Sequence, residues 1–89
     1  MSTRLEAIRA RLADALAPLE LQVVDESYKH VGHEGARDGR GHFAVRIVSS
    51  AFEGEPLLAR HRRVYDALGA LMQTDIHALS LKAIAPSET

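Results

Sequence analysis

The chain has 89 residues, a formal net charge of −1 and no cysteine. This length predicts a single domain, spanning residues 1–89, with one modest core. The near-neutral charge gives no general attraction to nucleic acid or anionic membranes, and the lack of cysteine excludes disulfides, thiol catalysis and an iron–sulfur site built from this chain's thiolates alone.

A helix and a short strand are predicted at the N-terminus. Thr3 and Glu6 have capping-box spacing. Apolar residues then recur at steps of three and four, as on one face of a helix, at Leu5, Ile8, Leu12, Leu16 and Leu19. Pro18 is expected to end this helix, and alternating apolar residues predict a first strand over residues 21–26.

A second strand is predicted over residues 42–50, with Phe43, Val45 and Ile47 on one face. The segment between the two strands, SYKHVGHEGARDGRG, is rich in glycine and has no apolar periodicity. It is much longer than a hairpin loop, which usually has about two to five residues. This loop is therefore a candidate for a functional role.

A second helix and a last strand complete the predicted fold. Phe52 and Gly54 indicate a turn, and Pro56 suits a first helical turn. The apolar stripe that follows has helical spacing and is widened by residues seven apart; its members are Leu57, His61, Val64, Leu68 and Leu71, with Leu58, Tyr65 and Met72. The order of elements predicts an α+β two-layer domain, with helices on one face of a three-stranded sheet.

The last strand, residues 76–84, contains an unexpected side chain. Leu79, Leu81 and Ala83 alternate as one apolar row, and His77 heads that row. The alternation therefore places an imidazole on the apolar side of the strand, near the start of the strand.

Three histidines are candidate metal ligands: His77, and His30 and His33 in the long loop. If that loop and the start of the last strand meet at one end of the sheet, His77 and either His30 or His33 form a two-imidazole site suited to zinc, copper or iron. Two imidazoles are fewer than the four ligands of a closed structural site, so a partner would supply the others. Alternatively, His30 and His33 chelate by themselves, or His77 is a partly buried core residue bonded to backbone and the loop histidines are solvated.

Arg60, Arg62 and Arg63 cluster in the predicted second helix. A basic helix after a turn can lie along a phosphate backbone. It can equally be a solvated polar face, or dock an acidic group of a protein partner or a small anion such as glutathione.

No catalytic triad, Walker A loop or GxGxxG motif occurs, so we do not expect an enzyme.

Three stretches, in order and over nearly the whole chain, resemble the BolA family: VVDESYKH, GHFAVRIVSSAFEGEPLLARHRRVYDAL and IHALSLKA. The most specific pieces are F-x-G, then L-x-R-H-R-x-V-Y, then I-H-A-L-S, at residues 52–54, 58–65 and 76–80. The resemblance implies an αββααβ fold similar to the class II KH domain. It also implies a heterodimer with a monothiol glutaredoxin that holds a bridging [2Fe–2S] cluster.

In that family pattern the glutaredoxin provides a cysteine, bound glutathione provides a second thiolate, and the BolA-like chain provides the remaining ligands. These are implied to be His77 and a loop histidine, which is His30 by position. The loop is longer than is common in the family and carries the extra His33, so His33 is the other candidate. Arg60, Arg63 and the turn from Phe52 to Pro56, with Gly54, are candidates for the partner surface.

The family's link to transcription control implies a second role, in which Arg60, Arg62 and Arg63, with Arg37 and Arg40 of the loop, bind DNA. Two features argue against it: no GxxG loop of the KH kind is present, and the acids of FEGEP occupy the place of a phosphate-binding loop.

No run approaches 18 apolar residues, and the N-terminus resembles no signal or transit peptide. We therefore expect a cytoplasmic protein without a membrane partner, a monomer or weak homodimer when alone.

Overall fold

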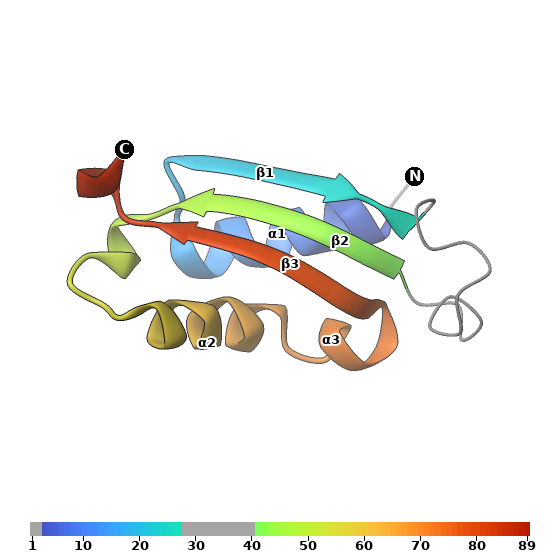
Figure 1. Cartoon of the computed structure of the whole chain (residues 1–89). Helices are drawn as coiled ribbons and strands as arrows, with labels where there is room; N and C mark the ends of the chain where they lie inside the picture. The colour runs from blue at the N-terminus through green and yellow to red at the C-terminus, as the bar shows by residue number, and fades with distance from the viewer. Residues whose placement is uncertain (1–2, 28–40) are drawn as a thin grey trace.

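A computed structural model describes residues 3–27 and 41–89 of the chain. In these residues the helices form one layer and a sheet forms the other (Figure 1). The elements are α1 (Arg4–Leu16), β1 (Glu20–Asp25), β2 (Gly41–Val48), η3 (Ser50–Phe52), α2 (Leu57–Leu68), α3 (Leu71–Thr74), β3 (Ile76–Ile84) and η4 (Pro86–Glu88). This order confirms the predicted α+β class and the αββααβ sequence of elements.

Local signals set the bounds of α1. The hydroxyl of Thr3 accepts a hydrogen bond from Glu6 N, and Thr3 N donates to the Glu6 carboxylate, each over 3.1 Å. This capping box satisfies two of the free amides at the helix start. The helix ends at Leu16, because Ala17 adopts a left-handed conformation with φ of 41°, directly before Pro18.

The sheet has the order β1-β2-β3, and its two pairings run in different directions. β1 pairs antiparallel with β2, and β2 pairs parallel with β3. The end of β1 and the starts of β2 and β3 therefore lie at the same edge of the sheet. The sequence left open whether the loop after β1 and the start of β3 meet. The loop leaves from the end of β1 and returns at the start of β2, and the topology places both at the same edge of the sheet as the start of β3.

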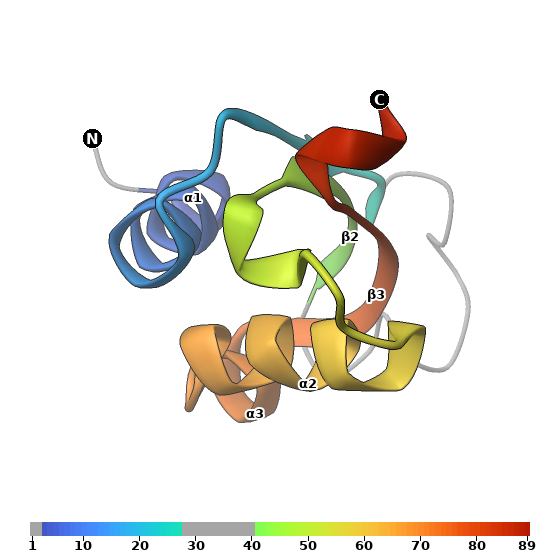
Figure 2. The same cartoon turned by 90° about the vertical axis from the view of Figure 1, so that its left-hand side faces the viewer.

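One face of the sheet packs on the helices, as the end-on view in Figure 2 shows. Phe43, Val45 and Ile47 of β2 alternate toward this face and are buried, as predicted. They meet Ile8 and Leu12 of α1 and the buried residues of α2 in one core. No described helix covers the opposite face of the sheet, so the side chains there form an open surface.

The predicted second helix is divided in two. Gly69, with φ of 54°, ends α2 at Leu68, and α3 begins at Leu71. The predicted apolar stripe is also too wide. Leu58 is 69% exposed and Tyr65 is 40% exposed, because a helix turns by about 100° per residue and carries both side chains away from the direction of the buried Val64.

β2 ends two residues earlier than predicted, since Ser49 begins a turn. The Ser49 hydroxyl accepts a hydrogen bond from Ala51 N (3.1 Å) and donates one to Leu16 O (2.6 Å). This buried side chain thereby joins the last carbonyl of α1, that of Leu16, to the first turn of η3. Over the described ranges, no helix has the length and apolar character needed to cross a membrane.

Candidate functional site

The edge of the sheet where β1 ends and β2 and β3 begin is fixed by backbone hydrogen bonds. Glu26 N donates to His42 O, and Gly41 N donates to Asp75 O, each over 2.8 Å. His42 N donates to the hydroxyl of Ser27 over 3.0 Å. The two ends of the segment 28–40 are therefore held together, next to the first residues of β3.

Gly41 allows this close approach. A Cβ atom at this position would lie 2.7 Å from Cε2 of Phe43 and 2.8 Å from Oγ of Ser27. Both distances are shorter than side-chain contacts normally allow, so a larger residue would displace the Phe43 ring and the Ser27 side chain. The glycine thus permits the geometry that places His42 beside β3.

His77 does not lie where strict alternation predicts. Gly41 pairs with Ile76 and His42 pairs with Ala78, so His77 is an extra residue in a β-bulge. Ile76 takes the core position and is 1% exposed, while His77 is exposed. The prediction that His77 heads the apolar row was therefore wrong, and so was the alternative of a partly buried core histidine.

The bulge brings His77 next to a histidine that sequence reasoning did not single out. The ring centroids of His42 and His77 are 5.1 Å apart, with a tilt of 49° between the ring planes. Two imidazoles bound to one tetrahedral metal ion, with metal–nitrogen bonds of about 2.0–2.1 Å, would have ring centres roughly 5 Å apart. The separation of this pair thus fits two ligands of one metal centre.

His42 could have been found from the sequence. Neighbouring parallel strands are usually joined through a helix, and parallel strands begin at the same edge of a sheet. His42 opens the predicted second strand and His77 opens the last one, with the predicted helix between them. That pattern allows the parallel pairing of β2 and β3 that the structure shows, and this pairing places the two imidazoles together.

The pair is too small for a complete metal centre. Within residues 3–27 and 41–89, no group of three or more His, Cys, Asp or Glu side chains is placed to hold a metal ion. The predicted ligands His30 and His33 lie outside the described residues. The two attachment points of their loop, Ser27 and Gly41, lie at the same edge as His77.

The three arginines of α2 have different environments. Arg60 is used within the fold, because its guanidinium donates to Glu55 O (2.8 Å) and Ala83 O (3.1 Å) and to both carboxylate oxygens of Glu88 (2.6 and 2.8 Å). Its side chain is only 11% exposed. The prediction that Arg60 contributes to a partner or DNA surface is therefore corrected: it fastens the C-terminal turn to α2.

The neighbouring arginines are exposed, and one of them, Arg63, pairs with another described residue. Arg63 forms an ion pair with Glu55. Arg62 forms no hydrogen bond or ion pair with any described residue, and it lies on the same side of α2 as Leu58 and Tyr65. Of the three arginines predicted for a binding surface, Arg62 is the one that can give its whole charge to a ligand.

The turn before α2 also differs from the prediction. Phe52 is 0% exposed and belongs to the core, so its side chain does not contact a partner. Gly54 has φ of 73°, a conformation that favours glycine, and a Cβ there would meet no other atom within 4 Å. Gly54 thus shapes the turn and is exposed, while Phe52 anchors it.

Comparison with known proteins identifies the family. A family model described as BolA-like protein matches residues 12–88. The chain belongs to the BolA-like protein family. Its solved relatives include the BolA domain of SufE1 from Arabidopsis thaliana, with a TM-score of 0.86 and 43% identity, over 100% of this chain and 99% of that one. The BolA-like fold inferred from the sequence motifs is thereby confirmed.

Curated relatives place the BolA-like domain in proteins of different lengths. SufE-like protein 1 of Arabidopsis thaliana, described as chloroplastic/mitochondrial, is 46% identical over 91% of this chain, which covers 23% of the relative. The DNA-binding transcriptional regulator BolA of Escherichia coli is 43% identical over 85% of this chain, which covers 70% of the relative. The chain thus spans less than a quarter of the first relative, whose name places it in organelles.

Proposed function

We propose that this BolA-like protein is a non-enzymatic adaptor that binds a monothiol glutaredoxin and co-ligates a bridging [2Fe–2S] cluster, for cluster trafficking or iron regulation. The observation that carries the proposal is the pair of imidazoles of His42 and His77, 5.1 Å apart at the edge of the sheet. Neutral imidazole is a ligand for iron, and it occurs together with thiolates in mixed iron–sulfur centres.

The proposal assigns the ligands in two groups. His77 is one ligand from this chain, and the second is His42 or one of the loop histidines, His30 and His33. Because the chain has no cysteine, the thiolates come from the glutaredoxin and from its bound glutathione. A half-built site of this kind would assemble only when the partner is present.

The position of His77 in a bulge supports this assignment. An imidazole in a mobile loop would lose conformational entropy on binding metal, whereas the backbone at His77 is already fixed by pairing on both sides, through Ile76 and Ala78. Each ligating imidazole must be neutral, so we expect the shared cluster to be more labile in acid than a cluster with four thiolates.

The test is to mix the protein with cluster-loaded monothiol glutaredoxin and to record visible absorption and circular dichroism, with iron and sulfide analysis of the co-purified complex. Alanine variants of His77, His42, His30 and His33 identify the ligands, and His61→Ala on α2 is the matched control. We expect His77→Ala to abolish the heterocomplex spectrum and His61→Ala to preserve it. An unchanged spectrum for His77→Ala would reject this role of His77.

A second candidate function is supported by Arg62 and by the DNA-binding transcriptional regulator among the relatives. Arg62 pairs with none of the residues described in the structure and lies on an exposed helix face, so its charge suits a phosphate contact. If the protein binds DNA in this way, a gel-shift assay will show affinity that falls steeply with salt and that is lost in Arg62→Glu. Binding that is insensitive to salt, or to this variant, would reject the candidate.

A further inference from the structure

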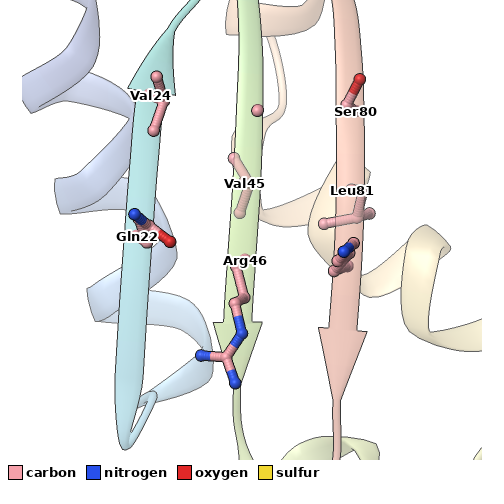
Figure 3. A pocket seen from close by; sticks show the side chains of 8 residues that line it. Gln22, Val24, Val45, Arg46, Ser80 and Leu81 are labelled. Atoms are coloured by element: carbon pink, nitrogen blue, oxygen red, sulfur yellow. The ribbon is translucent and has the colours of Figure 1, made fainter.

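The open face of the sheet contains a hollow that neither proposed function uses. It has a volume of about 290 Å³ and is lined by Gln22, Val24, Ala44, Val45, Arg46, Ser80, Leu81 and Lys82. Figure 3 looks onto this face, with Gln22 and Val24 on β1, Arg46 on β2 and Ser80 on β3. The hollow exists because the small residues Ala44 and Ser80, which are register partners, lie between longer side chains on the same face.

The hollow is positively charged. Arg46 and Lys82 are register partners on adjacent parallel strands, so their charges lie side by side. Arg46 forms an ion pair with Glu20 over 3.0 Å at the exposed end of the strands. Lys82 has no hydrogen bond or ion pair with any residue in the described part of the chain. Glu20 already offsets the charge of Arg46, so Lys82 provides the charge that a bound anion would neutralise.

The remaining lining is suited to a short aliphatic chain that ends in an acid. Gln22 and Ser80 provide hydrogen-bonding groups, and Val24, which is 41% exposed, provides an apolar surface. None of the described residues that line the hollow is aromatic, whereas proteins that bind single-stranded nucleic acid usually stack bases on aromatic rings. The chemistry therefore favours a carboxylate side chain of a protein over a nucleic acid.

We infer that this face is a docking surface for an extended acidic segment of a partner protein, with a Glu or Asp carboxylate between Arg46 and Lys82. The residues that line the hollow come from all three strands of the open face, so a segment docked there would lie against the sheet surface. It lies on the face to which His42 belongs, with Ala44 and Arg46 the next alternate residues of β2. The inference does not depend on the cluster proposal, since it needs no metal.

The test uses the ¹⁵N-labelled full chain, without metal, and a synthetic peptide that alternates Glu and Val with blocked ends. We expect saturable NMR shifts at the amides of Val24, Ala44, Ser80 and Lys82. Peptides that alternate Gln with Val, or Lys with Val, should not bind. Equal binding of the Gln–Val peptide, shifts confined to another face, or no binding at millimolar peptide would overturn the inference.

Charge reversal separates docking from a change in folding. Lys82→Glu is expected to weaken the Glu–Val peptide by about fivefold or more and to gain binding of the Lys–Val peptide, which a merely damaged fold could not do. Arg9→Glu, at an exposed position of α1, is the matched control and should leave both results unchanged. Failure of the Lys82→Glu variant to switch its preference counts against the inference.

Two other occupants are separate outcomes. If an oligothymidine strand shifts the same amides more tightly than the acidic peptide does, the face binds nucleic acid and the inference is wrong. If the amides shift with protein concentration alone, the face is an interface between two copies of this chain, and the inference is equally wrong.

Discussion

The guanidinium of Arg60 and the carboxylate of Glu88 form a two-point ion pair, with hydrogen bonds of 2.6 and 2.8 Å. The hydrogen bond from Arg60 is the main reason that the pKa of Glu88 falls from 4.5 to about 2, and a hydrogen bond from Ala85 N adds to it. The same bond raises the pKa of Arg60. Because Arg60 also donates to Ala83 O, the pair joins η4, α2 and the end of β3.

The first prediction follows from the lowered pKa of Glu88. A carboxyl group whose pKa is lower in the folded state contributes stability above its unfolded pKa, and this contribution is lost as the pH falls through the folded value. The window runs from 4.5 down to about 2. We expect the melting temperature of Glu88→Gln to lie below that of the wild type at pH 7 and to approach it as the pH falls toward 2.

Thermal unfolding followed by circular dichroism between pH 2 and 7 measures this convergence. Glu20→Gln is the control, since Glu20 pairs with Arg46 in an exposed position, where ion pairs contribute little. Its melting temperature should stay close to the wild type throughout. A constant difference between Glu88→Gln and the wild type over the whole range would show that the ionised carboxylate is not what stabilises the turn.

The second prediction concerns Gly41. In Gly41→Ala the new methyl group would meet Phe43 and Ser27 at 2.7 and 2.8 Å, so these side chains must shift, and Ser27 is the one that bonds to His42 N. Overpacking of this kind typically costs about 1–3 kcal/mol. Urea unfolding measures the loss, and the NMR signals of His42 and His77 report the displacement of the rings.

Gly54→Ala is the control for Gly41→Ala, because it meets no atom within 4 Å and has only its φ of 73° to strain it. We expect a cost of about 1 kcal/mol and no change at the two histidines. If Gly41→Ala leaves the histidine signals in place, the close packing at that glycine does not position the pair.

The third prediction separates the two kinds of residue that the sequence assigned to one binding surface. Phe52 is 0% exposed, so Phe52→Ala should lower the free energy of unfolding by about 3–5 kcal/mol. Arg62 is exposed, and Arg62→Ala should change the free energy of unfolding by less than about 0.5 kcal/mol. Urea denaturation compares the two variants, and equal effects would contradict the assignment of Phe52 to the core.

The sequence was sufficient to predict the bounds of an element where neighbouring residues set those bounds. The capping box of Thr3 and Glu6, the break at Ala17 before Pro18 and the bounds of β3 depend on neighbouring residues, and the structure confirms them. The family motifs also predicted the short helix α3, which the periodicity alone did not separate from α2.

The sequence was insufficient where distant residues decide. Arg60 is held within the fold by its ion pair with Glu88, 28 residues away. Helical spacing around Arg60 cannot show that partner. The exposure of Leu58 and Tyr65 has the same origin, because an apolar side chain in a helix does not reveal whether another element covers it. Of the candidate site, His77 was predicted as a ligand. Its contact with His42 needed one further step, the parallel pairing of β2 and β3, for which the helix between them was the sequence signal.

The last prediction tests the β-bulge that sets the side chain of His77. In a regular strand His77 would share the apolar side of Leu79, and replacing it with Val would stabilise the protein by adding to the core. In the observed register Ile76 is the buried residue, at 1% exposure. We therefore expect His77→Val to change the free energy of unfolding by no more than about 0.5 kcal/mol, and Ile76→Ala to lower it by about 2–5 kcal/mol. Urea unfolding of both variants distinguishes the registers, because a stabilising His77→Val together with a tolerated Ile76→Ala would mean that the strand is regular and that His77 faces the helices.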